Sequence, residues 1–178
     1  MNTKANRVAI VGSGSWATAI AKMVLENVTH INWFMRKPET TEHFVRTGHT
    51  PRYLQNVEFD TNRITFYNDI NEITAASDIL IMAVPSAYLP VILGTLKTDI
   101  SKKHILSGIK GVVSEENLLV VQYLNKFFHV PFENLGVIAG PCHAEEVALQ
   151  RLSYLTVACT DEEKAEKFAS LIRCDYIK

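Results

Sequence analysis

The chain has 178 residues and a mass of 20.0 kDa, enough for one domain whose core needs no disulfide or metal to hold it together. Hydrophobic residues make up 47% and charged residues 21%, so disordered and collagen-like classes are excluded. The net charge of −1 provides no global positive excess that would favour nucleic acid or an anionic membrane, and we expect neither as a partner.

The cysteines and the amino terminus bound the cellular location. Three cysteines, an odd number without CxxC spacing, predict reduced thiols rather than a disulfide framework or a zinc site. Residues 1–7 are polar and lead into the apolar run Val8–Val11, which is too short for a signal sequence or a membrane span. We therefore expect a cytoplasmic protein with no bound metal.

Short apolar runs alternate with amphipathic stretches along the chain. The runs that predict strands are 8–11, 31–35, 63–67, 78–84, 104–109, 135–139 and 153–158. The stretches that predict helices are 16–26, 39–46, 117–128 and 161–171, with a polar loop at 48–60. For the last helix, Thr160 is the predicted cap and Glu163 the partner in a capping box.

This alternation predicts βαβ units in a doubly wound, mostly parallel α/β sheet with helices on both faces. No repeat or flexible linker divides the sequence, so residues 1–178 are expected to form one domain. Residues 174–178 resemble the opening of a strand that stops early.

The sequence GSGSWA at residues 12–17 follows the first predicted strand and opens the first predicted helix. Gly12 allows a tight turn, Gly14 lets a pyrophosphate approach the backbone, and Ala17 lets the helix pack close to the sheet. The first amides of such a helix are unpaired and favour phosphate groups. The arrangement predicts a Rossmann-type dinucleotide site, and the alternative is a structural turn without a ligand.

The second predicted strand ends in Arg36 and Lys37, where NAD-preferring domains usually place an acid for the ribose 2′-hydroxyl. A guanidinium can bind a 2′-phosphate through two hydrogen bonds. The hypothesis is therefore a preference for NADP(H), mainly through Arg36. The alternative is a pair of solvated basic residues at the start of a loop.

Ligands of open α/β sheets bind at the carboxyl ends of the strands. Lys110 lies at such an end, between Gly108 and Gly111, where it could contact a phosphorylated or hydroxylated substrate. The alternative is an ordinary surface lysine. The next strand ends in GPCHAEE at 140–146, which lacks both an orienting acid for a Cys142 nucleophile and the spacing of a metal site.

Together these motifs resemble the N-terminal domain of the NAD(P)-dependent glycerol-3-phosphate dehydrogenases, over essentially the whole chain. The matching segments are the glycine turn at 12–19, PRYL at 51–54, AVPS at 83–86, Lys110–Gly111 and GPCHAEEV at 140–147. The resemblance implies NADP or NAD as cofactor. It also implies reversible reduction of glycerone phosphate to sn-glycerol 3-phosphate, a precursor of glycerophospholipids.

The resemblance implies a role for individual residues. With the turn glycines and the second basic residue included, the expected cofactor contacts are Gly12, Gly14, Ser15, Trp16, Arg36, Lys37, Tyr53, Lys110 and Ala144. The expected substrate contacts are Lys110, Gly140 and Cys142. Cys142 stands where the family usually has Ser or Thr, and a thiol is the weaker donor, so substrate binding is expected to be weaker. Ala17 replaces a usual Gly, and His143 replaces a common Phe.

The resemblance also implies a general base, a lysine in a helical C-terminal domain that we expect to be missing from these 178 residues. Oxidation of an alcohol needs a base for its proton. We therefore expect the 178-residue chain to bind NADP(H) with little or no turnover, and its catalytic residues stay unknown. The resemblance allows a homodimer of the full-length enzyme. Two alternatives remain: a stand-alone NADP-binding regulatory module, or a two-domain dehydrogenase for another small hydroxy acid.

Overall fold

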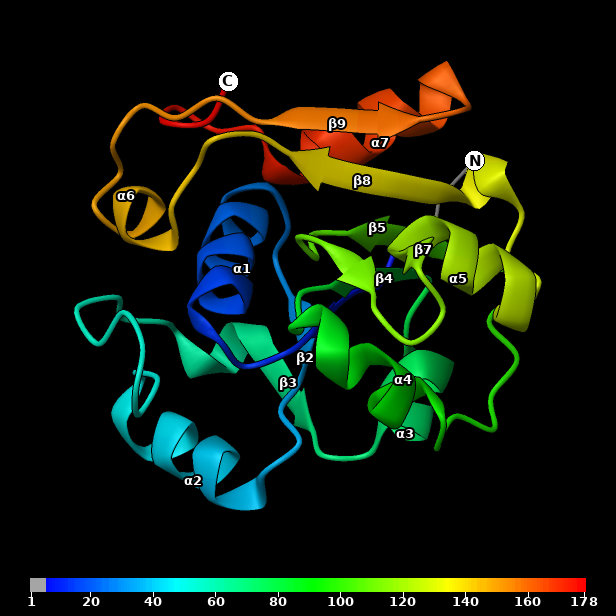
Figure 1. The fold of residues 1–178 in the computed structure, drawn as a ribbon. Helices are drawn as coiled ribbons and strands as arrows, with labels where there is room; N and C mark the ends of the chain where they lie inside the picture. The colour runs from blue at the N-terminus through cyan, green and yellow to red at the C-terminus, as the bar shows by residue number, and fades with distance from the viewer. Residues whose placement is uncertain (1–5) are drawn as a thin grey trace, which may run out of the picture.

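The computed structural model describes residues 6–178 and places seven strands in one sheet of order β3-β2-β1-β4-β5-β8-β9 (Figure 1). These strands are β1 Val8–Val11, β2 Ile31–Phe34, β3 Ile64–Tyr67, β4 Ile79–Met82, β5 His104–Ser107, β8 Leu135–Ala139 and β9 Thr156–Cys159. Neighbouring strands pair in parallel except β9, which runs antiparallel to β8. The predicted doubly wound, mostly parallel sheet is confirmed.

Helices cover both faces of this sheet. They are α1 Ser15–Asn27, α2 Pro38–Thr47, α3 Ile70–Ala76, α4 Leu89–Leu93, α5 Val120–Phe128, α6 Ala144–Ala148 and α7 Glu162–Ile172. One core lies under α1, α2, α6 and α7, and a second lies under α3, α4 and α5. The strand β1 contributes to both, because its side chains alternate between the two faces. Burial on both faces explains its unbroken apolar sequence.

An aromatic cluster fixes the region next to the first turn. The Trp33 ring on β2 meets the rings of Phe44 and Phe59 edge-on, with centroids 5.2 and 5.4 Å away. Its indole N–H donates to the carbonyl oxygen of Gly12 at 2.7 Å. The polar loop at 48–60 is thereby anchored, through Phe59, to the strand that precedes α2.

The helix expected at 117–128 begins later, at Val120. Leu118–Leu119 instead forms a short strand, β7, that pairs antiparallel with β6, Val112–Val113. Asn117 adopts a left-handed conformation, with φ of 51°, that suits the turn between these two strands. Asn tolerates this conformation better than most residues, and it ends the hairpin turn where a helix start was predicted.

The expected cap of the last helix is also wrong. Asp161, not Thr160, is the N-cap of α7, and its carboxylate accepts from the backbone N–H of Lys164 at 3.0 Å. The third helical residue is then Lys164, which rules out the capping box with Glu163. The short helices α3 and α4 were not predicted, because five to seven residues carry too little periodicity.

Within residues 6–178, no helix has the combination of length and apolar character that crossing a bilayer requires.

Candidate functional site

The loop between β1 and α1 is tightly constrained by the end of β4. Gly12 has a φ of +133°, and a Cβ placed on it would lie 2.4 Å from the carbonyl oxygen of Ala83. The backbone N–H of Gly12 donates to the carbonyl oxygen of Phe34 on β2 at 3.2 Å. Only glycine fits this position. The turn therefore packs directly against the carboxyl ends of β2 and β4.

Among residues 6–178, the first amides of α1 have no hydrogen-bond partner. Gly14 is the N-cap, it has no side chain to accept a hydrogen bond, and no acid occupies the first turn. A Cβ at Gly14 would meet no atom within 4 Å, so the space in front of this helix end is open. An open, uncapped end of a 13-residue helix fits a phosphate group, which accepts the free N–H donors and complements the helix dipole.

A cleft with two lobes opens at this point, at the carboxyl ends of the strands. The first lobe has a volume of about 450 Å³ and the second about 410 Å³. The residues that line both lobes are Gly14, Tyr53, Ala83, Val84 and Pro85. The glycine turn therefore lies where the two lobes meet.

The first lobe has a cationic rim. Arg36 and Lys37 both line it and are exposed, as predicted from the end of the second strand. The Lys37 ammonium lies 3.8 Å from the Glu39 carboxylate, a loose pair at the surface. Within the described residues, no ion pair or hydrogen bond engages the Arg36 guanidinium. This side chain is free to bind an anion in the lobe.

The second lobe holds a lysine in a defined place. The Lys110 ammonium donates to the carbonyl oxygen of Cys142 at 3.1 Å and lies 5.2 Å from the centre of the Trp16 ring. Both contacts hold the ammonium at a defined point of the lobe. Ser15 and Ala144 line the same lobe, so most of the expected contacts converge here.

The Cys142 thiol in this lobe is buried, with 1% of the residue exposed. Burial raises the pKa of the thiol, and the nearby Lys110 charge opposes that rise only in part. A neutral thiol can donate a weak hydrogen bond but is a poor nucleophile. The role of Cys142 in substrate binding stays a prediction.

Gly140 lies apart from the rest. It lines neither lobe, and its φ is +138°. A Cβ there would lie 2.8 Å from the carbonyl oxygen of Tyr154, in the segment that leads into β9. The structure thus gives Gly140 a packing role, and its contact with substrate stays a prediction.

Several lining residues were missed by the sequence reasoning. They are Glu39, Arg52, Tyr88, Val91 and Ile92 in the first lobe, and His143 and Glu145 in the second. Arg52 precedes the predicted Tyr53, and Tyr88 follows the AVPS motif, so proximity to those motifs was the available signal. Among residues 6–178, no group of three or more His, Cys, Asp or Glu side chains could hold a metal ion.

The sequence of residues 7–165 matches the family model described as the NAD-dependent glycerol-3-phosphate dehydrogenase N-terminus. The chain belongs to this family. The dehydrogenase relationship accounts for the uncapped helix, the glycine turn and the two-lobed cleft as parts of one dinucleotide-binding domain.

The curated proteins that this chain resembles in sequence are glycerol-3-phosphate dehydrogenases. Glycerol-3-phosphate dehydrogenase [NAD(P)+] of Pseudomonas fluorescens strain Pf0-1 is 31% identical over 161 residues, which is 90% of this chain and 45% of that protein. The corresponding protein of Pseudomonas syringae pv. syringae is 32% identical over 155 residues, 87% of this chain and 45% of that protein. The chain spans about half the length of the curated relatives it matches.

Solved structures agree on the fold. Glycerol-3-phosphate dehydrogenase from Plasmodium falciparum superposes with a TM-score of 0.87 at 25% identity, covering 97% of this chain and 51% of that one. The GPD1 enzyme from Saccharomyces cerevisiae superposes with a TM-score of 0.83 at 24% identity, covering 98% and 55%. The β-sheet and its crossover helices are therefore those of the dehydrogenase N-terminal domain.

Proposed function

We propose that residues 1–178 form the cofactor-binding half of a glycerol-3-phosphate dehydrogenase and bind NADP(H) across the two lobes. The observation that carries this proposal is the uncapped end of α1, which faces open space between a cationic lobe and a lysine-bearing lobe. The free amides after Gly14 would hold the pyrophosphate. The cofactor, when bound, supplies the hydride-transfer chemistry.

Each lobe would then hold one half of the dinucleotide. The first lobe would take the adenosine half, with Arg36 binding the 2′-phosphate of NADP(H) through charge-assisted hydrogen bonds. Glu39 lines the same lobe and could accept a hydrogen bond from the 2′-hydroxyl of NAD(H). Glu39 is near Lys37, whereas Arg36 has no ion-pair partner within residues 6–178, so the net charge of the rim favours the phosphorylated cofactor.

The second lobe would take the nicotinamide and the substrate. Lys110 would place a positive charge beside glycerone phosphate, either at its phosphate or at the oxygen that becomes negative during reduction. The Cys142 carbonyl holds the Lys110 ammonium in place, and the buried thiol would offer a weak donor nearby. Reduction of the carbonyl needs a proton donor and oxidation of the alcohol needs a base, and we assign this role to no residue of the two lobes. The product would be the sn-glycerol 3-phosphate from which glycerophospholipids are built.

The proposal is tested by titrating the chain with NADPH and NADH, in wild type and in Arg36→Ala. Loss of a bidentate contact to a phosphate should weaken NADPH binding about 10- to 100-fold. NADH binding should change little, because its ribose has no 2′-phosphate. Arg151→Ala is the matched control, since Arg151 is an exposed arginine that lines neither lobe.

Two results would count against the proposal. Absence of binding for both cofactors would remove the assignment of the cleft. Equal losses for NADPH and NADH in Arg36→Ala would leave the dinucleotide site intact but remove the role of Arg36 in cofactor choice.

A further inference from the structure

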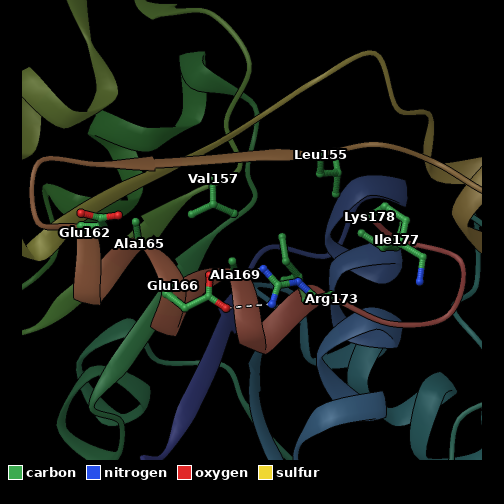
Figure 2. Close-up of a pocket in the computed structure, with 10 residues that line it drawn as sticks. Leu155, Val157, Glu162, Ala165, Glu166, Ala169, Arg173, Ile177 and Lys178 are labelled. Atoms are coloured by element: carbon green, nitrogen blue, oxygen red, sulfur yellow. Dashed lines mark hydrogen bonds and ion pairs between the residues drawn. The ribbon is translucent and has the colours of Figure 1, made fainter.

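The loop between α2 and β3 carries an exposed arginine, Arg52, at the edge of the cleft. Within residues 6–178, no hydrogen bond or ion pair engages its guanidinium. Arg173 on α7 differs, because its guanidinium pairs with the Glu166 carboxylate, with 2.7 Å between nitrogen and oxygen (Figure 2). Arg52 therefore keeps its planar set of donors available for an anionic ligand.

The backbone that carries Arg52 is held by hydrogen bonds at the base and at the tip of the loop. At the base, the N–H of Phe59 donates to the carbonyl oxygen of Gly48 at 2.9 Å. At the tip, the side-chain amide of Gln55 donates to the carbonyl oxygen of Pro51 at 2.8 Å. The second bond spans Arg52, so its backbone is positioned before a ligand binds, and less ordering entropy is lost on binding.

Arg52 lies where two hollows adjoin. It lines the first lobe, and it also lines a hollow of about 490 Å³ that includes Ser15, the first residue of α1. Arg36 lines the first lobe but not this second hollow. The two arginines therefore differ in position, because Arg52 shares a hollow with the start of α1 and Arg36 does not.

A carboxylate, that of Glu145, faces the same hollow. Both Arg52 and Glu145 are exposed, and within residues 6–178 they form no ion pair, so their mutual attraction is weak. The pyrophosphate of a dinucleotide carries a negative charge on each phosphate, and its oxygens can accept two parallel hydrogen bonds from a guanidinium. Such a ligand at the start of α1 would outcompete the Glu145 carboxylate for Arg52.

We propose that Arg52 binds the pyrophosphate of the dinucleotide from the loop, together with the amides at the start of α1. This inference rests on the proposed function and extends it. The pyrophosphate is common to NADP(H) and NAD(H), so Arg52 contributes to affinity for both cofactors. Arg36 contributes to the choice between them, and the site thus holds two arginines with separable roles.

The test is to titrate wild type, Arg52→Ala and Arg52→Lys with NADPH and with NADH. In Arg52→Ala, loss of charge-assisted hydrogen bonds should weaken binding of both cofactors by the same factor, about tenfold. Arg52→Lys keeps the charge without the planar donors and should recover part of that affinity. The matched control is Arg173→Ala, which removes an exposed arginine that lines neither lobe and should leave both affinities unchanged.

Three results would overturn the role of Arg52. Unchanged affinity for both cofactors, in an Arg52→Ala variant shown by urea denaturation to be folded, would exclude the contact. A loss confined to NADPH would place Arg52 at the 2′-phosphate instead of the pyrophosphate. An equal loss in Arg173→Ala would show that net charge, not a contact, causes the effect. A wild-type chain that binds neither cofactor would instead remove the proposed function itself, so the two failures are distinguishable.

Discussion

The two lobes of the cleft are built on different physical principles. In the first lobe, the basic side chains are exposed and loosely held, with Arg36 free of partners among residues 6–178 and Lys37 at 3.8 Å from Glu39. In the second lobe, the Lys110 ammonium has a carbonyl at 3.1 Å and an aromatic ring at 5.2 Å. The first is suited to attract a polyanion, and the second to hold one charge at a fixed point.

The difference shows how one sheet edge can serve two tasks. An exposed guanidinium can adapt to a phosphate, and its contribution to binding falls as salt concentration rises. A lysine with two local contacts is positioned before any ligand arrives, which reduces the ordering entropy lost on binding. The glycine turn lies between the two lobes, and Gly14 lines both of them.

The largest expected effect comes from breaking that shared turn. Gly12→Ala would place a Cβ 2.4 Å from the Ala83 carbonyl oxygen at a φ of +133°. We expect the free energy of unfolding to fall by about 3 kcal/mol or more, measured by urea denaturation, with both lobes lost.

Gly14→Ala is the informative comparison for Gly12→Ala. Its Cβ would meet no protein atom within 4 Å, and its φ of −84° suits any residue. Stability should change by about 1 kcal/mol or less, while NADPH affinity should fall about tenfold because the methyl group blocks the approach of the pyrophosphate. Normal NADPH affinity in a folded Gly14→Ala variant would contradict the assigned path of the cofactor.

The positioning of Lys110 can be tested without substrate. In Trp16→Leu, the Lys110 side chain loses an aromatic neighbour whose attraction amounts to about 0.5–1 kcal/mol. The ε-methylene proton resonances of Lys110 should move toward random-coil positions in NMR spectra, whereas Trp16→Phe should retain part of the ring-induced shift. Identical Lys110 resonances in wild type and Trp16→Leu would show that the lysine is as free as Arg36.

The smallest expected effect on the cleft comes from the opposite end of the sheet, where a substitution leaves both lobes intact. Arg7 donates to both carboxylate oxygens of Asp78, at 3.0 and 3.1 Å, and holds the pKa of that carboxyl at about 2. A lowered pKa in the folded state stabilises the protein above the unfolded pKa of about 3.9, and this contribution is lost as the pH falls toward 2.

The matching experiment compares wild type with Asp78→Asn by urea denaturation at several pH values. At pH 7 the variant should be less stable by about 1 kcal/mol, a figure reduced for the exposure of both side chains. The difference should disappear near pH 2, and NADPH affinity should not change. Glu115→Gln, an exposed carboxyl without an ion pair among the described residues, should show no such pH dependence.

The buried strands were predictable because their sequences carry the constraint locally. Ile79–Met82 is apolar at every position, since a central parallel strand packs on both faces, and the small residues at 12–17 are dictated by the turn itself. Hydrophobic spacing and glycine placement therefore located the sheet and the cleft. The same logic placed Arg36 at the rim, directly after a buried strand.

Other features depend on contacts that are distant in sequence. The sequence did not show that α5 begins only at Val120. Leu118–Leu119 fit the helical pattern, but in the structure they form a strand that pairs with Val112–Val113. The cap of α7 was ambiguous between two adjacent oxygen-bearing side chains, and only the backbone direction selects Asp161. Glu39 lines the first lobe because of how α2 is oriented on the sheet, and no local sequence pattern predicts that orientation.

The central claim is that the amides at the start of α1 hold the pyrophosphate of the dinucleotide. The most direct measurement is NADPH titration of the ¹⁵N-labelled chain, followed through backbone amide resonances. The account predicts the largest saturable shifts at Gly14, Ser15 and Trp16, with smaller shifts around Arg36. Binding that leaves these three amides unchanged, or shifts confined to other parts of the molecule, would contradict it.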